Sequence, residues 1–493
     1  MNFNKADILF AFAMLICGFL YWNLLDFGML GAGVTLFAMV IFTVAFVYML
    51  KSGYKQNIRS IICLILATLS ALQFTLFDNR FISFLNFMFL MVLFIYWVCL
   101  STSRQIDKKL SVYILGDAVK QGIRIPFMNF PCCVAGIKRS LSGQKKGKGI
   151  LAALIGILIF FPLIAAVVSL LMSADWAFEN FVGRFYDLLN FDTIVTYIGQ
   201  FIFGIPVAFY LYGLIYGNVK GRNTDKVTAE SVDRAAEIVR IAPKITIYSA
   251  LTVFNMIYIM FFAVQAAYLF SAFSGDLPET FTYADYARRG FFELCAVAGI
   301  NLLVLTVSYL TIKKGTSEEP KALRAETAVI SVFTILLIAT ALSKMAMYIS
   351  AYGLTQLRVF TSWFMVVLFI IFLVICVRQF IKFNSAKVII LGFVIMFMVL
   401  SYGNTDGLIA KYNIEMYEAG SLKTLDITAL YELSDAAVSH VYDLYRKTDD
   451  MEMRQKLESY INYNGYYGNS GFREFNFQRC RADAIRNEIG VAL

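Results

Sequence analysis

Long apolar stretches recur along the chain and are separated by short polar connections. Each has close to the ~20 residues that an α-helix needs to cross the hydrocarbon core of a membrane. We expect eleven membrane-spanning helices, at residues 8–25, 29–50, 59–77, 81–100, 149–172, 194–216, 246–270, 290–312, 327–345, 358–377 and 387–403. Within these stretches the only prolines are Pro162 and Pro206. The pattern predicts an all-α fold, a polytopic transmembrane helix bundle over residues 1–403.

The last ninety residues, 404–493, have a different pattern. Apolar residues recur every three to four positions in 426–433 and 434–442, and each stretch follows a residue that favours a helix N-cap. The segment 460–477 mixes three glycines with aromatic residues and predicts a turn-rich connection before a final helix. This region holds 10 basic and 14 acidic residues. We therefore expect a second, small helical domain that lies outside the membrane.

The distribution of Lys and Arg predicts how the chain is threaded. With the N-terminus inside, the inner segments hold 27 basic residues, and ten of them lie in the long inner loop 101–148. The outer loops hold only six: Arg80, Arg184, Arg288, Arg289, Lys344 and Arg358. Such an excess on one side follows the positive-inside rule. It places the N-terminus in the cytoplasm and residues 404–493 on the extracytoplasmic side.

Composition narrows the classes of function. Mean hydropathy is +0.68, and the net charge of +9 comes mainly from short loops between apolar stretches, which argues against nucleic-acid binding. His440 is the single histidine, and the eight cysteines have no zinc spacing. No phosphate-binding or dinucleotide-binding motif is present. We expect no metal and no cofactor, and whether the protein is an enzyme stays open.

Charged and amide side chains gather near the outer ends of the later spans. The candidate ligand-binding residues are Asp285, Arg288, Arg289, Glu293, Lys344, Arg358, Gln265 and Asn301. Charged groups at the edge of the hydrocarbon are costly and often mark functional sites, and guanidinium groups match phosphate geometry. In this hypothesis Arg288 and Arg289 hold an anion and Glu293 orients them.

Structural roles compete with this reading. Arg289 and Glu293 are spaced i, i+4 and can neutralise each other. Lys344 and Arg358 can extend to lipid head groups, and Asn255 and Asn301 can join helices by hydrogen bonds.

Three stretches resemble a known family. They are 283–294 followed by Asn301, then 404–415 followed by 430–437, and the closing segment 472–482. Together they resemble a bacterial family of polytopic membrane proteins, domain of unknown function 4173, which is related to domain of unknown function 4153. Thr405 stands where the family commonly has proline. The resemblance implies a multi-pass protein of the bacterial cytoplasmic membrane, and it implies no particular activity.

Three functions remain open after these observations. The first is a cell-envelope role in which an outward-facing pocket binds an anionic lipid or a lipid-linked substrate, so that membrane lipids are the expected partners. The second is a secondary transporter for a small solute, which favours broken helices and an inverted repeat. The third is a membrane sensor or assembly factor that binds a protein partner through residues 404–493.

Overall fold

The structure, a computed structural model, describes residues 3–142, 191–225, 227–274, 291–313, 321–463 and 471–491, with scattered positions between 156 and 182. Ten of the described helices are long and apolar enough to cross a membrane. They are α1 (Lys5–Leu24), α2 (Ala32–Lys51), α3 (Ile58–Leu76), α4 (Arg80–Ser101), α10 (Phe191–Lys220), α12 (Lys244–Ser274), α14 (Phe291–Thr311), α15 (Lys321–Tyr352), α16 (Gln356–Phe380) and α17 (Ser385–Tyr402). The expected all-α multi-pass bundle is confirmed.

Side-chain caps explain where several of these helices begin. Asn57, Asn79, Thr355 and Asn384 precede α3, α4, α16 and α17, and each side chain accepts a hydrogen bond from a backbone N–H three residues further on. Such caps satisfy donors that the first helical turn leaves without a partner. The polar connections between apolar stretches therefore set the start of the spans as well as their separation.

A first bundle consists of α1–α4, α10 and the short helix α7 (Phe130–Ser142), which share one hydrophobic core. Helices α1 and α10 pack closely because glycines meet: a Cβ atom placed on Gly204 would lie 2.5 Å from the carbonyl oxygen of Gly18. Small residues allow this close approach of two helices in a membrane. At one end of the pair Asn23 donates a hydrogen bond to Gln200, 3.4 Å away.

The buried carboxylate of Asp7 joins three helices at the other end of this pair. Its Oδ1 atom lies 2.9 Å from Nζ of Lys220 on α10 and accepts a 2.9 Å hydrogen bond from the hydroxyl of Tyr48 on α2. Its Oδ2 atom accepts the backbone N–H of Asn4, and this contact completes a capping box at the start of α1. A fully buried charge is tolerated because it has a cationic partner and hydrogen bonds.

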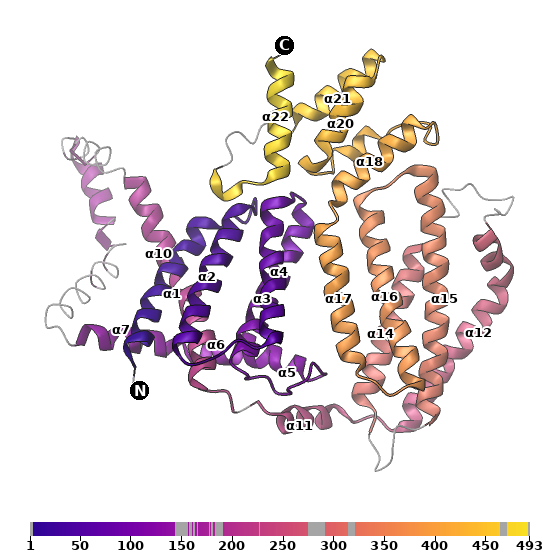
Figure 1. Cartoon of the computed structure of the whole chain (residues 1–493), viewed down its shortest axis with the longest axis horizontal. Helices are drawn as coiled ribbons and strands as arrows, with labels where there is room; N and C mark the ends of the chain where they lie inside the picture. Colours follow the sequence, from indigo (N-terminus) through magenta and orange to yellow (C-terminus); the bar gives the residue numbers. More distant parts are fainter. Residues whose placement is uncertain are drawn as a thin grey trace.

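A second bundle consists of α12, α14, α15 and α16 around its own hydrophobic core. Helix α17 lies between the two bundles (Figure 1). Its Phe397 ring is 4.7 Å from the ring of Phe89 on α4, and the Tyr402 hydroxyl donates to the carbonyl of Leu69 on α3. Aromatic contacts and one hydrogen bond therefore connect α17 to the first bundle.

The expected span at 149–172 lies mostly outside the described residues. Its described positions from 166 to 172 are helical. The long loop 101–148 contributes α5 (Ile114–Val119), the π-helix η1 (Lys120–Arg124) and α6 (Ile125–Met128) ahead of α7. These helices and α11 (Ala229–Val239) lie at the same end of the bundles as the N-terminus (Figure 1).

The C-terminal helices occupy the opposite end, above the ends of α2, α3 and α17 (Figure 1). They are α18 (Thr405–Glu418), α19 (Ile427–Leu430), η2 (Asp435–Ala437), α20 (Val438–Lys447), α21 (Met451–Tyr463), η4 (Phe472–Glu474) and α22 (Phe477–Val491). Leu430, Val441, Leu457 and Ile461 belong to a hydrophobic cluster that these helices share. We call the end of the bundles that they cover the capped end.

Candidate functional site

The segment from η4 to the start of α22 binds the capped end of the first bundle through its backbone and Asn476. The carbonyl of Phe475 accepts the backbone N–H of Ala32 at the start of α2, at 2.9 Å. The Asn476 side-chain amide donates to the carbonyls of Phe74 and Phe77, at 2.9 and 2.7 Å. These contacts satisfy backbone groups that helix ends leave without partners. The C-terminal helices therefore complete the ends of α2 and α3.

A chain of buried charges continues this interface. Arg479 of α22 is paired with Asp78 in the α3–α4 connection, and its Nε atom lies 3.9 Å from the carboxylate of Asp435. Asp435 is also paired with Arg486, whose Nη1 atom lies 2.7 Å from Asp483. The side chains of Asp78, Arg479, Asp435 and Arg486 are between 6% and 12% exposed. The ion chain therefore runs from the first bundle into the C-terminal helices through low-dielectric surroundings.

Burial raises the pKa of the Asp78 carboxyl to about 6. Removal from water disfavours the charged form. The Arg479 guanidinium opposes this effect and lowers the pKa, Asp435 raises it, and Arg80 lowers it. Desolvation is thus only partly offset by the ion pair, and Asp78 changes its charge near pH 6.

Asp78 and Arg479 also line a cavity of about 150 Å³ at the capped end. Its walls come from the α1–α2 connection, the first turns of α4 and the start of α22, and its lining residues are Phe27, Gly28, Met29, Leu30, Asp78, Arg80, Ser83, Phe84, Phe87, Met88 and Arg479. We call it the arginine pocket. Its volume is smaller than the ~300 Å³ from which pockets for drug-sized ligands begin, so it suits a head group or a short part of a larger molecule.

The arginine pocket combines an aromatic wall with charged groups. The rings of Phe27 and Phe87 meet edge to face at 5.8 Å, and Phe84 and Met88 contribute further apolar surface. Two guanidinium groups, of Arg80 and Arg479, stand against the single carboxylate of Asp78. The lining therefore places two guanidinium groups and one carboxylate beside apolar side chains, and guanidinium groups are suited to contact with anionic oxygens.

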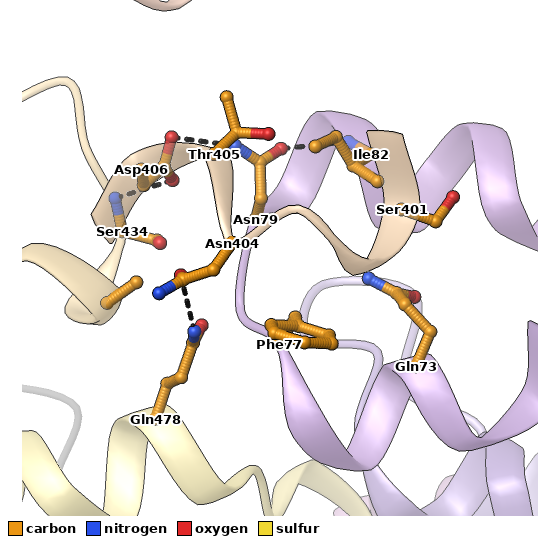
Figure 2. A pocket seen from close by; sticks show the side chains of 11 residues that line it. Gln73, Phe77, Asn79, Ile82, Ser401, Asn404, Thr405, Asp406, Ser434 and Gln478 are labelled. Atoms are coloured by element: carbon orange, nitrogen blue, oxygen red, sulfur yellow. Dashed lines mark hydrogen bonds between the residues drawn. The ribbon is translucent and has the colours of Figure 1, made fainter. Parts of the chain in front are cut away.

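A second, smaller cavity of about 10 Å³ lies where α3, α4, α17 and the C-terminal helices meet (Figure 2). Asp406 of α18 holds this junction together, since its carboxylate accepts hydrogen bonds from Asn79, Gln356 and the backbone of Ser434. Around the cavity, Gln73 Nε2, Ser401 Oγ and Ser434 Oγ have no hydrogen-bond partner in the described part of the chain. A volume of this size accommodates one water molecule with several polar partners.

One comparison with known proteins identifies a family. A family model described as "Domain of unknown function (DUF4153)" matches residues 61–444. The chain belongs to the DUF4153 family. The match begins within α3 and ends within α20, so it includes Asp78, Arg80 and Asp435. This is the family named from the sequence as related to domain of unknown function 4173, whereas membership of family 4173 itself is not confirmed. No curated protein and no solved structure matches the chain.

The candidate residues from the sequence fall into two groups in this DUF4153 protein. Asp285, Arg288 and Arg289 lie outside the described residues, as does the side chain of Gln265 on α12. Glu293 is exposed in the first turn of α14, and its carboxylate acts electrostatically on the half-buried Lys344 ammonium of α15. These two charges therefore interact electrostatically between neighbouring helices of the second bundle.

Arg358 and Asn301 have structural partners. The Arg358 guanidinium donates to the carbonyls of Tyr352 and Gly353 at the end of α15 and lies 4.3 Å from the ring centre of Tyr348. Asn301 is buried on α14, where its amide donates to Thr334 at 2.8 Å and accepts from the Tyr258 hydroxyl. Asn301 thereby joins three helices, which is the interhelical alternative considered from the sequence.

The residues of the arginine pocket were not selected from the sequence, although two of them were visible as unusual charges. Arg80 is one of the six basic residues expected outside, and Asp78 is a rare acidic residue in an early connection. Arg479 lies in the closing segment 472–482, which carried the family resemblance. No group of three His, Cys, Asp or Glu residues that could hold a metal ion occurs in the described ranges.

Proposed function

We propose that this DUF4153 protein has a cell-envelope role in which the arginine pocket binds an anionic lipid or a lipid-linked substrate. The observation that carries the proposal is the composition of the pocket, in which two guanidinium groups and one carboxylate stand beside aromatic walls. Guanidinium groups pair with phosphate by two parallel hydrogen bonds. The apolar walls then receive the first part of the acyl or prenyl chain.

The position of the pocket supports a lipid over a water-soluble anion. Its α4 residues lie in the first turns of a spanning helix, so that ligand chains attached at this level continue along apolar surface. Phe81 and Phe84 of this helix are 51% and 57% exposed. Exposed phenylalanines on a spanning helix provide apolar surface that lipid chains can cover. A phosphate held by Arg80 would therefore have its hydrocarbon alongside α4.

Replacing Arg80 with glutamine is expected to lower the affinity for an anionic phospholipid about tenfold, since one charge-assisted contact contributes roughly 1.5 kcal/mol. Native mass spectrometry of the gently solubilised protein measures the bound fraction during titration with phosphatidylglycerol. Arg481→Gln is the matched control, because this exposed arginine lies on α22 away from the lining. Equal binding by wild type and Arg80→Gln would contradict the proposal.

Two further titrations separate the sources of the anion. Glycerol phosphate carries an anionic phosphate without acyl chains, and phosphatidylcholine carries the chains without net charge. The proposal expects phosphatidylglycerol to bind more tightly than either. If glycerol phosphate binds as tightly as phosphatidylglycerol, the site recognises a soluble phosphate and the apolar wall has no role in affinity.

Transport is a second candidate because one carboxylate lies between two spanning helices. Glu326 of α15 accepts hydrogen bonds from Thr252 and Asn255 of α12, the first at 2.8 Å. Ionisable groups within apolar helices often mark the path of a proton or ion. The proposal of lipid binding is preferred because the arginine pocket is a cavity with groups of complementary chemistry.

Proton-coupled transport would require Glu326. The assay uses proteoliposomes with a pH-sensitive dye and a potassium diffusion potential. Wild type is expected to take up protons, and Glu326→Gln is expected to lose this uptake because an amide side chain has no carboxylate to carry a proton. Glu237→Gln on α11 is the matched control, since this glutamate lies outside the spanning helices. Absence of proton uptake in wild type, or equal uptake in Glu326→Gln, would remove this support for transport.

A further inference from the structure

Two residues belong both to the arginine pocket and to the ion chain. Asp78 and Arg479 line the cavity and are paired with each other. Behind this pair, Arg479 donates to the carbonyl of Glu474 at 2.7 Å and faces Asp435 at 3.9 Å. The charged wall of the pocket is therefore also the contact that holds α22 on the first bundle.

We propose that an anionic ligand in the arginine pocket replaces the Asp78 carboxylate as the partner of Arg479, so that ligand binding and docking of the C-terminal helices are coupled. The inference rests on the proposed function and adds its regulation. Ligand binding in the arginine pocket and docking of α22 through Asp78 therefore compete for the guanidinium group of Arg479. In this mechanism binding of the lipid weakens the contact between α22 and the first bundle.

The geometry explains why the two anions compete. Arg479 is 6% exposed, and its three nitrogen atoms are directed toward Asp78, the Glu474 carbonyl and Asp435. A guanidinium has five N–H donors in a fixed fork and cannot turn toward a new partner without leaving an old one. Anions that share one buried cation also repel each other strongly at low dielectric. Displacement of Asp78 therefore costs less than adding a third anion beside Asp78 and Asp435.

Protonation of Asp78 removes the competitor. The charged groups that face Asp78 are Arg479 of α22, Arg80 of α4 and Asp435 of η2. Burial raises the pKa of Asp78 to about 6, so the carboxyl is mostly neutral below this pH and mostly charged above it. A phosphodiester keeps its charge over the same range. Affinity for such a ligand is therefore expected to rise as the pH falls through about 6.

The test uses the full-length protein in phosphatidylcholine nanodiscs, titrated with phosphatidylglycerol at pH 5 and pH 7.5. Wild type is expected to bind up to about thirtyfold more tightly at pH 5, because a carboxyl with a pKa of about 6 is roughly 90% neutral at pH 5 and roughly 3% neutral at pH 7.5. Asp78→Asn imitates the neutral carboxyl, so it is expected to bind tightly at both pH values. Asp449→Asn removes an exposed charge in the connection between α20 and α21 and is expected to keep the wild-type dependence.

Hydrogen exchange at pH 7.5 provides a second readout. Amides of α22 are expected to exchange faster in wild type when phosphatidylglycerol is bound than in phosphatidylcholine alone. Tight binding with no dependence on pH, or with the same pH dependence in Asp78→Asn, would overturn the coupling and leave the proposed function intact. No binding of phosphatidylglycerol by wild type at either pH would overturn the proposed function itself.

Discussion

Replacing Arg479 with alanine is expected to release the C-terminal helices from the first bundle. The substitution leaves Asp78 and Asp435 as buried carboxylates without their shared cation, and it removes the donor to the Glu474 carbonyl. Removing one partner of a buried ion pair costs about 3–5 kcal/mol, because the remaining charge stays desolvated. This exceeds the effect expected for any exposed charge on the same helices, where ion pairs contribute about 0–1 kcal/mol.

Hydrogen exchange locates this effect. In Arg479→Ala the amides of residues 472–491 are expected to exchange much faster than in wild type, while those of α15 and α16 keep their protection. Arg481→Ala is the matched control on the same helix, and it is expected to leave exchange unchanged because this side chain is exposed. Combining Arg479→Ala with Asp78→Asn is expected to recover part of the protection, since Asp78→Asn removes one of the carboxylates left without a cation. Unchanged exchange in Arg479→Ala would show that the contacts of Phe475 and Asn476 are enough to dock α22.

The sequence predicted the spanning helices well because their length and hydropathy are local properties. Ten of the eleven expected stretches coincide with described helices to within a few residues at most ends. The main differences occur at α15, which extends the expected 327–345 to Lys321–Tyr352. Its additional turns contain polar residues, and hydropathy alone cannot separate such turns from a loop.

The arginine pocket could not be predicted in the same way, because its residues are brought together by long-range pairing. Asp78 and Arg479 are 401 positions apart in the chain, and neither lies in a motif of fixed spacing. The pattern of apolar residues along a helix indicates which face of that helix is buried. It does not indicate which distant segment of the chain covers the end of the helix. The rarity of charges in the early connections was the available signal, and it marked Asp78 and Arg80 without indicating their partner.

Arg358 illustrates the opposite case. Its position at the outer end of a span made it a candidate for binding an anion, yet its guanidinium occupies the carbonyls at the end of α15 and the ring of Tyr348. The end of an α-helix carries partial negative charge and attracts cations. A basic residue in the first turn of the next helix, close to the end of the preceding one, therefore has a local explanation. The sequence alone does not distinguish it from a ligand-binding residue.

Replacing Gly204 with valine is expected to prevent assembly of the first bundle. A Cβ atom on Gly204 would lie 2.5 Å from the Gly18 oxygen and 2.9 Å from the backbone nitrogen of Phe19. These are backbone atoms, so no side-chain rotation can relieve the overlap, and α1 must move away from α10. Overpacking typically costs about 1–3 kcal/mol, and a clash with backbone atoms lies at the upper end of this range. The separation also strains the pair between Asp7 and Lys220.

Gly199→Val provides the matched control, since it makes the same change on the same helix where a Cβ atom meets nothing within 4 Å. The helix-propensity cost is equal in the two variants, so only the contact with α1 differs. In mild detergent, size-exclusion chromatography is expected to show a monodisperse peak for Gly199→Val and aggregated or absent protein for Gly204→Val. A normal peak with unchanged thermal stability for Gly204→Val would mean that close packing of α1 on α10 does not hold the first bundle together.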